Sequence, residues 1–158
     1  MTAINIILSA DAVHVLADGA VLNADGLIHG IAPKGLILSH LNAVIAARGA
    51  RIALPMIYGA IIDELSLASF DELYAGFSFI AKTVWNQPVM QEMLNQNPFG
   101  AQAELYLAGW SESRGPAALR TSSTDWVDIP LDNVNVTPCD EVVFEQLKAE
   151  VPNAFEIE

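Results

Sequence analysis

The first fifty residues constrain the fold most strongly, because three apolar runs are separated there by short polar turns. These runs are rich in Ile, Leu, Val and Ala and cover residues 3–8, 12–17 and 41–47. Five residues that could take part in catalysis lie at the ends of the runs or between them: Thr2, Asp18, Lys34, Arg48 and Gly49. Apolar runs of this length bounded by turns predict strands. The pattern therefore predicts one site at strand ends, built from these five residues.

This pattern resembles the N-terminal-nucleophile (Ntn) hydrolases, specifically the proteasome β subunits and their simpler bacterial relative. After processing, those chains begin with Thr, carry an Asp-containing turn after the second strand, and then a Lys and a Gly-rich turn. Thr2, Asp18, Lys34 and Gly49 follow the family's spacing without a gap. A second match at 108–116, Ala-Gly-Trp-Ser-Glu-Ser-Arg-Gly-Pro, resembles the family's glycine-aromatic-acidic turn followed by Gly-Pro.

The resemblance implies a four-layer αββα sandwich, in which two mainly antiparallel sheets lie between helices. We expect residues 1–158 to form a single domain of this kind. Family members usually continue well beyond the Gly-Pro hairpin, into a Ser-containing turn and further helices. Only about forty residues follow Pro116 here, so the resemblance implies a fold trimmed in its C-terminal half.

The residues themselves also predict an α+β fold. The expected strands are Thr2–Ser9, Ala12–Asp18, Leu27–Ile31, Gly35–Leu38, Leu41–Ala47, Ala101–Ala108, Ala117–Thr121 and Asp125–Ile129. The expected helices are 50–65, a helix capped by Ser69 and Glu72 that ends near Gln87, 89–96 and 140–151. Because the strands are apolar almost throughout, we expect sheets covered on both faces. His14 is accordingly expected in the core.

Composition narrows the function further. A net charge of −12 argues against nucleic-acid binding, because phosphates would be repelled. Apolar content of 53% predicts either a sheet that is buried on both faces or a surface that other subunits cover in part. Arg48 and Arg51 interrupt the longest apolar region, so a membrane span is not expected. The lone Cys139 cannot form an internal disulfide, and the three histidines lack metal-ligand spacing. We expect a cytoplasmic protein that uses neither metal nor cofactor.

The resemblance implies a specific chemistry for the five residues. The hydroxyl of Thr2 would attack a carbonyl, and its α-amine, with an ordinary pKa of about 7.7–8.0, would take the proton. Lys34 would lower the pKa of that amine, while Asp18 would hold the lysine. A backbone N–H of the Arg48-Gly49 turn would donate to the oxyanion. Arg48 stands where the family has a glycine, and its side chain would close the adjacent specificity pocket.

Two hypotheses follow for function. The first is a threonine peptidase or amidohydrolase of proteasome type, which acts on a peptide or amide in a homo-oligomer after removal of Met1. The second is a catalytically silent Ntn-fold subunit that retains Met1 and helps to build a larger particle, such as a phage-like virion or a compartment. Both predict extensive contacts with neighbouring subunits. Retention of Met1 separates them, because it would turn the amine of Thr2 into an amide.

Overall fold

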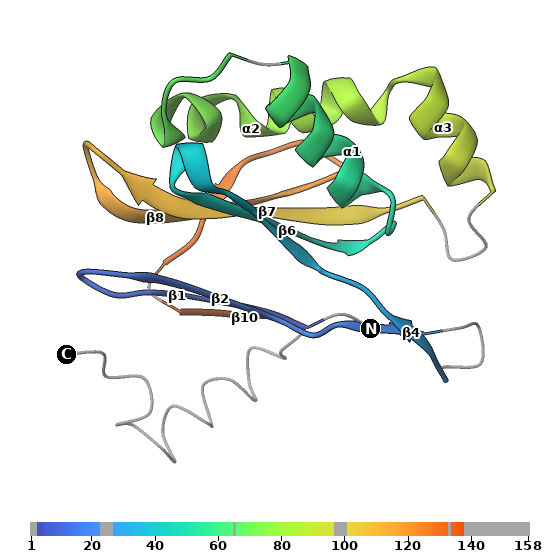
Figure 1. Ribbon diagram of the computed structural model, residues 1–158, viewed down its shortest axis with the longest axis horizontal. Coiled ribbons are helices and arrows are strands. Elements are labelled where there is room, and N and C mark those ends of the chain that lie inside the picture. Colours follow the sequence, from blue (N-terminus) through green and yellow to red (C-terminus); the bar gives the residue numbers. More distant parts are fainter. Residues whose placement is uncertain (1–2, 23–26, 65, 97–100, 133, 138–158) are drawn as a thin grey trace.

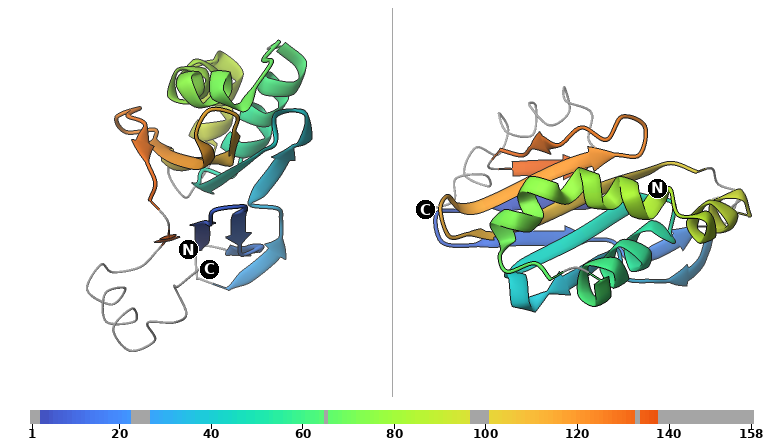
Figure 2. Two further views of the ribbon diagram at one scale, coloured as in Figure 1. Left: turned by 90° about the vertical axis from the view of Figure 1, so that its left-hand side faces the viewer. Right: turned by 90° about the horizontal axis from the view of Figure 1, so that it is seen from above.

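The computed structural model describes residues 3–22, 27–64, 66–96, 101–132 and 134–137. Its helices cover one face of a five-stranded sheet, and a three-stranded sheet lies against the other face (Figure 1). The side view in Figure 2 shows the same three layers, and its view from above shows the helices lying over the strands of the five-stranded sheet. The mixed helix and antiparallel-sheet composition confirms the predicted α+β class.

The five-stranded sheet is antiparallel, with strand order β5-β6-β7-β8-β9. Its strands are β5 (Gly35–Leu38), β6 (Ala43–Gly49), β7 (Ala103–Ser111), β8 (Gly115–Ser122) and β9 (Ile129–Pro130). The predicted hairpin of the second family match is confirmed as the β7–β8 turn, where Ser111 pairs with Gly115. This turn lies at the opposite end of the sheet from Gly49, which pairs with Ala103.

The three-stranded sheet has the order β10-β1-β2 and is also antiparallel. It consists of β1 (Ile4–Leu8), β2 (Val13–Ala17) and β10 (Val134–Thr137). A separate two-stranded sheet joins β3 (Ala20–Leu22) to β4 (Ile28–Ile31). Strands β1, β2 and β4 agree with the expected ones, whereas the short strands β3 and β10 were not predicted from the sequence.

The helical layer comprises α1 (Ala53–Gly59), which continues into the π-helix η2 (Ala60–Glu64), α2 (Phe70–Trp85) and α3 (Pro88–Asn95). The predicted cap of α2 is confirmed, because the Ser69 hydroxyl accepts a hydrogen bond from the N–H of Glu72 at 3.2 Å. The Glu72 carboxylate reaches back to the N–H of Ala68 at 2.9 Å. No helix in these described ranges is long and apolar enough to cross a membrane.

Alternate residues of the central strands serve different layers. Ile45 on β6 and Leu107 on β7 pack in the large core beneath the helices. The opposite face presents Ala46, Tyr106 and other residues to the three-stranded sheet, where Ile4 and Ile6 are fully buried. The small side chain of Ala46 leaves room for these isoleucines, so the two sheets pack face to face. The expectation of a sheet covered on both faces is therefore confirmed for β6 and β7.

Three local predictions differ from the structure, and a fourth lies outside the residues that it describes. The strand expected over Asp125–Ile129 is wrong, because a turn occupies its start and β9 is only Ile129–Pro130. The strand expected from Leu41 begins later, because a short 3₁₀ helix, η1 (Ser39–Leu41), precedes it. His14 is exposed rather than buried, because it lies on the face of β2 that points away from the five-stranded sheet. The helix expected over 140–151, together with Cys139, lies outside the described residues.

Candidate functional site

The start of β1 is tied to the end of β2 through Asp18. The N–H of Asp18 donates to the carbonyl of Ala3 at 3.1 Å, and the N–H of Ala3 donates back to the Asp18 carboxylate. The second carboxylate oxygen accepts from the N–H of Ala20 at 2.9 Å. Asp18 therefore lies beside the residue that follows Thr2, while Thr2 itself lies outside the described residues.

Backbone hydrogen bonds continue from Asp18 toward the other predicted site residues. Gly19, the next residue, accepts from the N–H of Ala32 at 2.9 Å. Two residues further on, the carbonyl of Lys34 accepts from the N–H of Ala47 at 3.0 Å. Arg48 and Gly49 directly follow Ala47. The structure thus brings the backbones at Asp18, Lys34 and the Arg48-Gly49 turn into one connected region.

Gly49 has a structural requirement of its own. Its φ of +93° is one that residues with a side chain rarely adopt, and a Cβ there would lie 2.2 Å from the carbonyl oxygen of Gln102. The same carbonyl accepts a hydrogen bond from the N–H of Ala50 at 2.8 Å. The close approach of β6 to the start of β7 explains this glycine. Its predicted role as part of an oxyanion-binding turn stays a prediction.

Arg48 takes part in an ion-pair group on the sheet surface. Its Nη1 lies 3.2 Å from Oε2 of Glu104, the residue directly opposite on β7. Nη1 of Arg120 on β8 lies 4.0 Å from the other oxygen of Glu104, and the hydroxyl of Tyr106 donates to Oε2 at 3.0 Å. Of these four residues, only Arg48 was predicted from the sequence as part of a site. Only the strand register, which the sequence does not give, brings them together.

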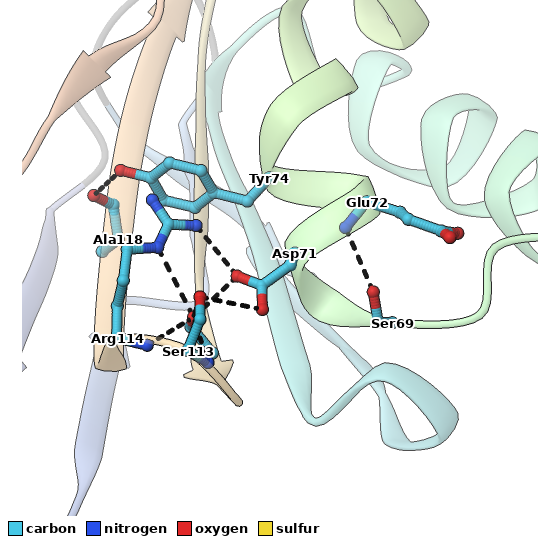
Figure 3. A network of polar contacts seen from close by, with 8 residues as sticks. Ser69, Asp71, Glu72, Tyr74, Ser113, Arg114 and Ala118 are labelled. Atoms are coloured by element: carbon cyan, nitrogen blue, oxygen red, sulfur yellow. Dashed lines mark hydrogen bonds and ion pairs between the residues drawn. The ribbon is translucent and has the colours of Figure 1, made fainter.

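A second polar cluster joins the β7–β8 turn to the start of α2 (Figure 3). The buried Ser111 hydroxyl donates to Asp71 at 2.6 Å, and Nη2 of Arg114 lies 3.0 Å from the same carboxylate. The Arg114 guanidinium also lies 4.2 Å over the ring of Tyr74. Hydrogen bonds from Ser111 and then from Arg114 hold the pKa of the Asp71 carboxyl below its usual range.

This cluster lies at the opposite end of the five-stranded sheet from the predicted site. Gly49 lies six positions after Ala43 on β6, which is a length of about 20 Å. All described members of the cluster bind one another or backbone groups of the turn. It is a structural clasp. Elsewhere in the described ranges, no three His, Cys, Asp or Glu side chains are gathered as metal ligands would be.

Comparison with known proteins identifies the fold class. No family model and no curated protein matches the sequence. Among solved structures, Anbu (ancestral beta-subunit) from Yersinia bercovieri superposes with a TM-score of 0.66 at 11% identity. An Anbu (Gly-1) mutant from Hyphomicrobium sp. strain MC1 gives 0.66 at 10%, and eukaryotic HslV from Trypanosoma brucei gives 0.60 at 13%.

These three similarities extend over almost the whole chain, since they cover 96%, 94% and 99% of it. The chain in turn spans 66% and 64% of the two Anbu chains and 80% of the HslV chain. It is therefore shorter than each of them. At such low identity the similarity defines the fold alone. The fold is that of the proteasome-like Ntn hydrolases, as the N-terminal pattern implied.

Proposed function

We propose that this protein is a proteasome-like threonine peptidase or amidohydrolase that becomes active when Met1 is removed. The observation that carries the proposal is the hydrogen-bonded connection from Ala3 through Asp18 and Gly19 to Lys34 and Ala47. It joins four segments, each more than ten residues from the next, and it starts where β1 begins. The proteasome-like fold supports the proposal, because a nucleophile at the start of β1 would meet a carboxylate and a lysine there.

In this mechanism the chain supplies every catalytic group. The Thr2 hydroxyl attacks the substrate carbonyl and the freed α-amine of Thr2 accepts its proton. The positive charge of Lys34 lowers the pKa of this amine, so more of it is neutral at pH 7. A backbone N–H in the Arg48-Gly49 turn stabilises the tetrahedral oxyanion, an interaction typically worth about 3–4 kcal/mol. The amine then returns the proton to the leaving nitrogen, and water hydrolyses the resulting ester.

The proposal is tested by hydrolysis of a library of fluorogenic peptides. We expect the wild type to cleave at least one peptide, Thr2→Ala to be inactive, and Thr2→Ser to retain part of the rate because it keeps a hydroxyl nucleophile. Equal rates for the wild type and Thr2→Ala would exclude Thr2 as the nucleophile. Circular dichroism of each variant would separate loss of chemistry from loss of fold.

We further propose that the protein works as a homo-oligomer. Large apolar side chains are exposed on and beside the β3–β4 sheet: Leu27 at 66%, Ile28 at 71% and Ile31 at 87%. Exposed apolar patches commonly mark protein–protein contacts. Light scattering tests this assignment, because Ile31→Asp should lower the particle mass, whereas Val127→Asp, at an exposed position far along the chain, should not. An unchanged mass for Ile31→Asp would contradict it.

The alternative is a silent Ntn-fold subunit that builds a larger particle. A specific observation favours it, because the candidate residues also have purely structural explanations. Asp18 satisfies backbone N–H groups of Ala3 and Ala20, and Gly49 avoids a collision with Gln102. Under this alternative Met1 is retained and Thr2→Ala assembles normally. The peptide assay above, combined with light scattering of Thr2→Ala, distinguishes the two functions.

A further inference from the structure

The ion-pair group of Arg48, Glu104 and Arg120 lies on the face of the five-stranded sheet that is turned toward the three-stranded sheet. On this face Ala46, Tyr106 and other residues pack around Ile4 and Ile6. Arg48 and Glu104 are each two residues from Ala46 and Tyr106 on the same strands, so they lie on the same face. The charged group therefore begins where the apolar core between the two sheets ends.

The group also lies at the end of the sheets that holds the candidate site. Figure 1 shows the start of β1 at the same end as the end of β6 and the start of β7. Arg48 directly follows Ala47, whose N–H binds the carbonyl of Lys34. A substrate whose reacting carbonyl lies beside the start of β1 would have its side chains within reach of this surface.

The charges within the group are not balanced. Glu104 has one negative charge, and two guanidinium groups share it. Its Oε2 is bound both by Arg48 and by the hydroxyl of Tyr106, whereas Arg120 approaches Oε1 only to 4.0 Å. The side chain of Arg120 is 41% exposed. A guanidinium has five N–H donors, so Arg120 keeps the capacity to bind a second carboxylate.

We propose that Arg120, assisted by Arg48, forms a carboxylate-binding subsite that selects substrates with an acidic side chain. This inference rests on the proposed function, since it specifies the substrate class of the same site. A planar guanidinium matches a carboxylate with two parallel hydrogen bonds, which an amide of the same shape cannot reproduce. The subsite also gives an acidic substrate a local attraction on a protein whose net charge is −12 and would otherwise repel it.

A simple ion pair would behave differently. Arg48 and Glu104 are directly opposite each other on β6 and β7, which is a common stabilising arrangement in sheets. If stabilisation were the whole function of the group, removal of Arg120 would alter the melting temperature and leave ligand preference unchanged. The test must therefore measure whether the protein binds an acidic ligand more tightly than a neutral ligand of the same shape.

The test uses the full-length Thr2→Ala protein, so it does not depend on catalysis. Blocked tetrapeptides of alanine, with Glu or Gln at each position in turn, are titrated by calorimetry. We expect Glu to bind about tenfold more tightly than Gln at one position, as a charge-assisted bidentate contact predicts. Arg120→Gln should reduce this ratio to about one and Arg120→Lys should keep part of it. Arg51→Gln, at an exposed arginine outside the group, should leave it unchanged.

The outcomes separate this inference from the proposed function. Equal binding of Glu and Gln peptides at every position, or no binding of either, overturns the subsite. A Glu preference that survives in Arg120→Gln overturns its assignment to Arg120. An Arg120-dependent Glu preference, in a protein whose wild type never reacts at Thr2, would keep the subsite and exclude the peptidase.

Discussion

The Asp18 carboxylate accepts a hydrogen bond from the backbone N–H of Ala3, which fixes the start of β1 against the end of β2. This contact lies one residue from Thr2 and is reinforced by the bond from the N–H of Ala20. The start of β1, one residue after the proposed nucleophile, is therefore held by the carboxylate of a residue fifteen positions further along the chain. The same carboxylate is proposed to hold Lys34, so one side chain would position both catalytic partners.

We predict that Asp18→Asn both lowers the free energy of unfolding and slows the reaction of Thr2. The substituted amide has one acceptor oxygen for two backbone donors, and the loss of a hydrogen bond to a charged group costs about 1.5–3 kcal/mol. Urea denaturation should show this loss, and the reaction of Thr2 with an electrophile should slow at least about tenfold. Asp11→Asn, at the exposed β1–β2 turn, is the matched control. Identical results for both variants would contradict the assignment.

Gly109→Ala should be strongly destabilising. A Cβ at Gly109 would lie 2.5 Å from the carbonyl oxygen of Asn42 and 2.7 Å from the ring of Phe70, the first residue of α2. Since the backbone oxygen cannot move without disturbing β6, we expect a loss of about 1–3 kcal/mol in the free energy of unfolding. Gly59→Ala, which has open space around it, should change stability little or increase it. Equal stability of the two variants would show that the packing at Phe70 is looser than described.

The clasp at Asp71 should make part of the free energy of unfolding depend on pH in the acidic range. Because Ser111 and Arg114 lower the pKa of Asp71 in the folded protein, the folded state binds this proton less readily than the unfolded state. Its contribution is fully present above the unfolded pKa of about 3.9 and is lost as the pH falls through the lower, folded value.

Denaturation of wild type and Asp71→Asn across pH measures this contribution. The difference in unfolding free energy should be constant above about pH 5 and should shrink below about pH 4. Glu92→Gln, at an exposed site on α3, should show no such change. A difference between wild type and Asp71→Asn that stays constant down to pH 2 would contradict the clasp.

The sequence predicted the elements whose local signals are strong. Helix α2 carries its cap at Ser69 and a regular apolar face, and the strands of the two central sheets are long apolar runs. Short strands such as β3 and β9 have no such signal, because their pairing partners rather than their own residues define them. His14 was misplaced because an apolar run does not reveal which face of a sheet is covered.

The site could be predicted only in part. The order of Asp18, Lys34 and Gly49 was visible in the sequence because a family resemblance supplied the spacing. Glu104 and Arg120 were not visible, because they come from strands that join Arg48 only through the register of β6, β7 and β8. The structural reason for Gly49 was hidden as well, since the Gln102 carbonyl that requires it lies more than fifty residues away. These residues are brought together by the pairing of strands that are distant in the chain, which local sequence patterns do not reveal.

The proposed activity requires Thr2 to be a nucleophile with a free α-amine. The most direct test is the intact mass of the protein from its native host, before and after incubation with a β-lactone. If Thr2 is the nucleophile, we expect Met1 to be absent and one adduct to form in the wild type and disappear in Thr2→Ala. A protein that retains Met1 and forms no adduct would exclude Thr2 as a nucleophile and leave the structural subunit as its function.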